Sequence, residues 1–129
     1  MKLTLLVVDD EPQLLRLMTQ VLERQDYAVV SAADGEEAIS VLNEHRDSLC
    51  GAVIDVFIPP RGSGELLEAL HAARPDLGPI VVSGAPLDGD MAQRVESMGG
   101  RFLQKPFRPA TLIETVRDLL GASSGPGDA

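Results

Sequence analysis

A chain of 129 residues, of which 44% are hydrophobic and 3% aromatic, fits one domain with an aliphatic core. Its formal net charge of −9 argues against binding to nucleic acid or to an anionic membrane, because both surfaces would repel it. Cys50 is the only cysteine, which excludes an intrachain disulfide and favours a cytoplasmic location, and no apolar run reaches the roughly 20 residues of a membrane-spanning helix.

Short apolar runs alternate five times with helical stripes of apolar residues, which indicates five strand–helix units. The first run, residues 3–8, is continuous, as in a parallel strand that is buried on both faces. The first helix begins at Pro12, a residue that suits the first helical position. Asp34 caps the second helix, and Glu37 follows three residues later as in a capping box. The predicted strands cover residues 3–8, 27–32, 50–54, 79–82 and 101–104.

The later part of the chain contains a predicted loop, three helices and a tail. Residues 59–64 form a loop by composition, and the third helix ends before Pro75. The last helix begins at Pro109, and Gly121 is its predicted stop. The domain is therefore expected over 1–121, with a flexible tail at 122–129. The inward stripes of these helices are Leu66, Leu67 and Leu70, then Met91, Ala92, Val95 and Met98, and finally Leu112, Ile113, Val116, Leu119 and Leu120.

Five successive strand–helix units imply an α/β fold with a parallel sheet and helices on both of its faces. Right-handed crossovers limit the possible strand orders. We expect a flavodoxin-like (βα)5 three-layer sandwich with the order 2-1-3-4-5. Ligands of such sheets bind beyond the carboxyl ends of the strands. The polar residues at those ends are Asp9, Asp10, Asp55, Ser83 and Lys105.

These five residues could together bind a phosphoryl group and a metal ion. Carboxylates that lie close together repel one another unless a cation intervenes, and magnesium prefers a site made of oxygen ligands. An aspartate can act as a nucleophile toward phosphorus, and a lysine and a hydroxyl can bind the phosphoryl oxygens. Taken alone, an Asp-Asp pair after a strand is more often a solvated turn than a metal site, and a lysine such as Lys105 is usually a surface residue, while Asp55 could be a helix cap and Ser83 part of a turn. Only their joint occurrence at the ends of separate strands favours the site.

The motifs around these residues resemble the receiver domain of response regulators over about residues 3–120. The matching segments are 6–11, 55–59, 81–84 and 102–107. The last two are similar to receivers of hybrid histidine kinases, and a single-domain response regulator is the other form that fits. The resemblance implies a phosphoacceptor domain of two-component or phosphorelay signalling.

The resemblance assigns a role to each site residue. Asp55 is the implied phosphoacceptor, and Ser83 and Lys105 are the implied partners of the phosphoryl group. Phe102 and Ser83 are implied to form the switch, and the peptide bond before Pro106 is cis in the family. The implied ligands of Mg2+ are Asp9, Asp10, Asp55 and the backbone carbonyl of Phe57.

The resemblance also implies partners. The phosphoryl donor is a histidine kinase or a histidine phosphotransfer protein, and the downstream effector is not named by the sequence. A partner helix is expected beside the first helix, where Leu17 lies at the edge of the inward stripe. The domain is expected to catalyse its own phosphorylation and dephosphorylation, with no classical enzyme activity. The loop at 59–64 is one residue longer than is usual in the family.

Three other functions compete with that of a receiver domain. A phosphatase of the haloacid dehalogenase type needs an aspartate two residues after the nucleophile, where Phe57 stands. A flavodoxin-like flavin binder needs a first loop that attracts phosphate, and residues 9–11 are all acidic. A receiver-like interaction module that acts without phosphorylation would have the same fold, so the sequence leaves it open.

Overall fold

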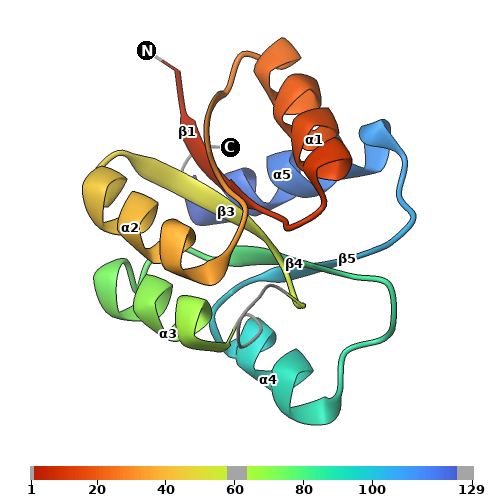
Figure 1. The fold of residues 1–129 in the computed structure, drawn as a ribbon. Helices are drawn as coiled ribbons and strands as arrows, with labels where there is room; N and C mark the ends of the chain where they lie inside the picture. The colour runs from red at the N-terminus through yellow and green to blue at the C-terminus, as the bar shows by residue number, and fades with distance from the viewer. Residues whose placement is uncertain (1, 58–63, 125–129) are drawn as a thin grey trace.

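The computed structural model describes residues 2–57 and 64–124. Its five strands form one parallel sheet in the order β2-β1-β3-β4-β5 (Figure 1). The α/β class and the strand order predicted from the sequence are thus confirmed. The pairing of each strand is in parallel register, with Val8 opposite Ile54 and Asp55 opposite Val82. The strands are β1 (Thr4–Val8), β2 (Ala28–Ala32), β3 (Leu49–Asp55), β4 (Pro79–Ser83) and β5 (Arg101–Gln104).

Helices cover both faces of the sheet because successive side chains of each strand point to opposite sides. Leu6 and Val8 of β1 pack with α2, α3 and α4, whereas Leu5 and Val7 pack with α1 and α5. Two aliphatic cores therefore lie above and below the sheet. The helices are α1 (Pro12–Arg24), α2 (Gly35–His45), α3 (Gly64–Ala73), α4 (Gly89–Ser97) and α5 (Pro109–Ser124). Among these helices, all within the described residues, none has both the length and the hydropathy of a membrane span.

The capping of α2 follows the prediction with one difference. The Asp34 carboxylate accepts a hydrogen bond from the Glu37 backbone N–H at 2.8 Å. The Glu37 carboxylate in turn accepts from the backbone N–H of Ala33 at 2.7 Å, one residue before the cap. Both ends of the box are therefore present, and they fix the start of α2 beside the strand that precedes it.

Two predictions about the helices were wrong. Helix α5 does not stop at Gly121 but continues to Ser124, because Gly121 does not take the left-handed conformation of a helix stop. A glycine inside a helix costs only about 1 kcal/mol, which neighbouring turns can offset. Ala92 is exposed rather than inward, because α4 buries Val95 and leaves Ala92 on an open groove beside Phe102. The predicted loop at 59–64 and the predicted tail at 122–129 were each too long at one end, because Gly64 begins α3 and residues 122–124 belong to α5. The other residues of the loop and the tail, 59–63 and 125–129, lie outside the described residues.

Candidate functional site

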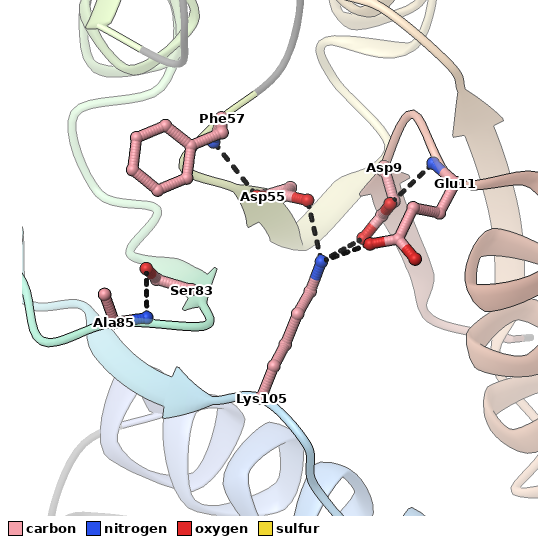
Figure 2. A network of polar contacts seen from close by, with 7 residues as sticks. All are labelled: Asp9, Glu11, Asp55, Phe57, Ser83, Ala85 and Lys105. Atoms are coloured by element: carbon pink, nitrogen blue, oxygen red, sulfur yellow. Dashed lines mark hydrogen bonds and ion pairs between the residues drawn. The ribbon is translucent and has the colours of Figure 1, made fainter.

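Polar side chains from three strands meet at the carboxyl end of the sheet (Figure 2). Asp9 directly follows β1, Asp55 is the last residue of β3, and Lys105 directly follows β5. Asp9 is 0% exposed and Asp55 is 4% exposed, although both are carboxylates. Buried charges are rarely found without a partner, so these two acids need a counter-charge.

The Lys105 ammonium supplies that charge. Its Nζ donates to Asp55 Oδ2 at 2.9 Å and lies 3.4 Å from Asp9 Oδ2. It also donates to Glu11 Oε1 at 3.1 Å. The predicted convergence of Asp9, Asp55 and Lys105 is thus present, and it includes an acid that we did not predict as a site residue.

The sequence analysis did not identify Glu11 as a site residue. Nothing in the sequence around it indicates that its side chain turns back toward the end of the sheet and contacts Lys105. Glu11 is the N-cap residue of α1, directly before Pro12. Acidic residues are common at helix N-termini without any role in a site, because they interact favourably with the helix dipole. The available hint was that it continues the acidic run 9–11.

Backbone N–H groups fix one oxygen of each buried carboxylate. The Glu11 N–H donates to Asp9 Oδ1 at 2.8 Å, and the Phe57 N–H donates to Asp55 Oδ1 at 3.0 Å. In both cases the donor lies two residues after the aspartate, as in an Asx turn. The chain thereby orients the two Oδ2 atoms toward the space that Lys105 enters (Figure 2).

The electrostatics of the site reflect this burial. The pKa of Asp9 is raised to about 6, mainly because burial removes its carboxylate from water. The negative charge of Asp55 raises this pKa further. The hydrogen bond from the Glu11 backbone N–H and the positive charge of Lys105 lower it. Burial alone would lower the pKa of Lys105, but its hydrogen bonds to Asp55 and Glu11 raise it above the usual value. The ammonium is therefore charged at neutral pH.

The same carboxylates have the composition of a cation site. Asp9 Oδ2 is buried and has no hydrogen-bond partner among the described residues, although Lys105 lies within ion-pair distance. Oxygens of Asp9, Glu11 and Asp55 all lie within 4.8 Å of one another. An unsatisfied buried carboxylate oxygen in an oxygen-only cluster fits a hard cation such as magnesium. The residues present therefore fit the metal that the sequence resemblance implies.

Asp10 and the carbonyl of Phe57 were also predicted as metal ligands, and those assignments stay predictions. Asp10 is exposed in the turn between β1 and α1, and it is not part of the cluster formed by Asp9, Glu11 and Asp55. The Phe57 side chain is 70% exposed, and the contact that places Phe57 at the site is its backbone N–H.

Ser83 lies between the strands that carry Asp55 and Lys105. It ends β4, is buried, and its carbonyl accepts a hydrogen bond from the Lys105 N–H at 2.8 Å. Its hydroxyl oxygen accepts from the Ala85 N–H at 3.2 Å and stands apart from the lysine (Figure 2). Phe102 of β5 is 39% exposed and lines the groove beside α4. The peptide bond between Lys105 and Pro106 is cis, as the resemblance implied.

Comparisons with known proteins agree with this geometry. A family model described as response regulator receiver domain matches residues 5–117. The response regulator GtcR of Aneurinibacillus migulanus is 30% identical over 120 residues, which cover 93% of this chain and 48% of that protein. The DNA-binding response regulator MtrA of Mycolicibacterium smegmatis is 32% identical over 122 residues, covering 93% and 51%. The chain spans about half the length of the curated relatives it matches.

Solved structures match over nearly the full length. The receiver domain of the hybrid histidine kinase CckA has 27% identity and a TM-score of 0.78, covering 91% of this chain and 98% of that one. A CheY-like response regulator receiver domain protein from Methanospirillum hungatei JF-1 has 26% identity and a TM-score of 0.85, covering 96% and 98%.

Proposed function

This chain belongs to the response regulator receiver domain family of two-component signalling, and from that premise we propose that Asp55 is its phosphoacceptor. The observation that carries the proposal is the 2.9 Å hydrogen bond between Lys105 Nζ and Asp55 Oδ2 at the carboxyl end of the sheet. This contact supports the proposal because it joins a buried carboxylate, which would be the nucleophile, to a charged donor that would bind a phosphoryl oxygen after transfer.

In the proposed reaction a carboxylate oxygen of Asp55 attacks the phosphorus of a phosphohistidine in line with the leaving nitrogen. The new bond joins phosphorus to the Asp55 oxygen, and the bond to the imidazole nitrogen breaks with its electron pair remaining on nitrogen. Lys105 shifts its hydrogen bond toward a phosphoryl oxygen, which offsets the added negative charge. Small phosphodonors would react in the same way.

Mg2+ is the proposed cofactor. Asp9 and Asp55 would hold it, together with Asp10 and the Phe57 carbonyl that the resemblance implies, and its charge would stabilise the transferring phosphoryl group. The support from this chain is the unsatisfied Asp9 Oδ2 and the clustering of the acids around it.

The proposed output is a change of surface at α4, β5 and α5. A phosphoryl group carries roughly −1.5 to −2 charge units and strong acceptor oxygens, so it would attract the Ser83 hydroxyl. Movement of Ser83 would leave space for the half-exposed Phe102 ring to turn inward. Because Phe102 has no hydroxyl, this switch would act through packing alone.

The proposed partners follow from the reaction. A histidine kinase or histidine phosphotransfer protein would dock beside α1, where Leu17 is 44% exposed. A downstream effector would bind the switched surface. The alternative, an interaction module that acts without phosphorylation, has no specific observation in its favour.

Incubation with a small acyl phosphate and magnesium tests the proposal, with intact mass as the readout. We expect the wild type to gain one phosphoryl group and Asp55→Asn to gain none. Asp76→Asn is the matched control, since Asp76 is an exposed acid that pairs with Arg74. Equal gains in wild type and Asp55→Asn would refute the assignment.

A further inference from the structure

Three acids among the described residues pair with Lys105, and Glu11 is the one of these to which the proposed function gives no role. Its Oε1 accepts a hydrogen bond from Lys105 Nζ at 3.1 Å. The Glu11 side chain is 63% exposed, whereas that of Lys105 is 19% exposed and those of the other two acids are buried. The ammonium thus lies between Asp55 on one side and the carboxylates of buried Asp9 and exposed Glu11 on the other (Figure 2).

The ammonium and a divalent cation would compete for the same oxygens. A lysine has three N–H donors, and here three carboxylates lie within 3.4 Å of its nitrogen. The same three acids make up the candidate cation cluster. A cation bound to Asp9 and Asp55 would neutralise the charges that attract Lys105 and would repel the ammonium directly. Glu11 would then be the acid of this cluster left to hold the lysine.

We propose that Glu11 is a positioning residue that keeps the Lys105 ammonium beside Asp55 while magnesium occupies the two buried carboxylates. Glu11 contacts the lysine rather than the reacting phosphorus, so it acts through Lys105. Its exposure suits this role, because a solvated glutamate can follow the ammonium as the lysine moves from Asp55 to a phosphoryl oxygen. The inference rests on the proposed function and deepens it.

The first test measures the rate of phosphorylation by a small acyl phosphate across a magnesium titration. Because an exposed ion pair contributes modestly, Glu11→Gln should lower the maximal rate by about two- to fivefold. The magnesium concentration at half-maximal rate should stay unchanged, and Glu11→Asp should recover part of the loss. Glu23→Gln, an exposed charge change on α1, should leave the rate unchanged. A higher magnesium requirement at an unchanged maximal rate would make Glu11 a metal ligand and overturn the inference.

The second test needs no phosphorylation. A double-mutant cycle with Glu11→Gln and Lys105→Met measures how strongly the two residues are coupled in the unfolding equilibrium, with chelator and with saturating magnesium. We expect a coupling of about two- to fivefold in the equilibrium constant that persists with magnesium. A coupling present only with chelator overturns the inference.

The two proposals fail in different ways. A wild type that gains no stability from magnesium and no mass from the phosphodonor would contradict the proposed function, and the inference with it. A wild type that binds and reacts as expected, together with a Glu11→Gln variant of equal maximal rate, would overturn the inference alone.

Discussion

Lys105 and Asp55 are 50 positions apart in the sequence and are joined by a 2.9 Å hydrogen bond. Their strands are not neighbours, because β4 lies between β3 and β5. The Lys105 side chain therefore extends from the end of β5 past the end of β4, where Ser83 lies. Its ammonium group reaches Asp55 at the end of β3 and Asp9 after β1. This one contact fixes the site at the centre of the carboxyl edge of the sheet.

Removal of the lysine charge should destabilise the metal-free protein. In Lys105→Met the buried Asp9 and Asp55 lose their counter-charge, so we expect the free energy of unfolding to fall by about 1–3 kcal/mol in chelator. Added magnesium should restore part of this loss by replacing the missing cation. Urea denaturation with and without magnesium measures both effects. Lys2→Met serves as the control, because Lys2 pairs with exposed Asp26 at 3.8 Å, and a loss there of equal size would contradict the argument.

The pKa of Asp9 predicts a specific pH dependence of stability without metal. Its pKa rises on folding from 3.8 to about 6, so the folded state retains a proton that the unfolded state releases. The contribution of Asp9 to stability is thus complete below pH 4 and is lost as the pH rises to about 6, by about 3 kcal/mol. Asp9→Asn lacks this titration.

The measurable quantity is the difference in unfolding free energy between Asp9→Asn and wild type in chelator. We expect this difference to rise in favour of Asp9→Asn between pH 4 and pH 6 and then level off. A difference that stays constant across this range would mean that burial does not perturb Asp9.

The sequence predicted the fold and most of the site for definite physical reasons. Apolar runs identify the buried strands β1, β3 and β4, and the polar residues at the strand ends mark the carboxyl edge where Asp9, Asp55 and Lys105 meet. Glu11 could not be assigned in this way, because its role depends on a side-chain rotamer that reaches back to a lysine 94 positions away.

Other details depend on packing that periodicity does not encode. The stop of α5 depends on backbone conformation at Gly121, and glycine is compatible with both helix and turn. Ala92 belongs to the same predicted apolar stripe as Val95, yet Val95 is buried and Ala92 lines an open groove with Phe102. A stripe of apolar residues predicts which face of a helix points toward the core. It does not predict how much of that face the neighbouring elements bury.

Gly100 should be intolerant of a side chain. A methyl group at this position would lie 2.5 Å from the Pro79 carbonyl oxygen and 3.0 Å from Val95 Cγ1, where the starts of β4 and β5 meet. We expect Gly100→Ala to lower the free energy of unfolding by about 1–3 kcal/mol through overpacking. Gly89→Ala is the matched control, because among the described residues no atom beyond its chain neighbours and its own helix backbone lies within 4 Å of the added methyl group. Equal stability of the two variants in urea would contradict the close approach.

Direct identification of the modified residue tests the central claim most closely. After reaction with a small acyl phosphate and magnesium, borohydride reduces an aspartyl phosphate to homoserine, which tandem mass spectrometry can locate in the sequence. We predict homoserine at position 55 in the wild type, dependent on both phosphodonor and magnesium. Reduction at position 9 or 10, or a phosphoryl group that resists borohydride on a hydroxyl such as that of Ser83, would contradict the assignment of Asp55.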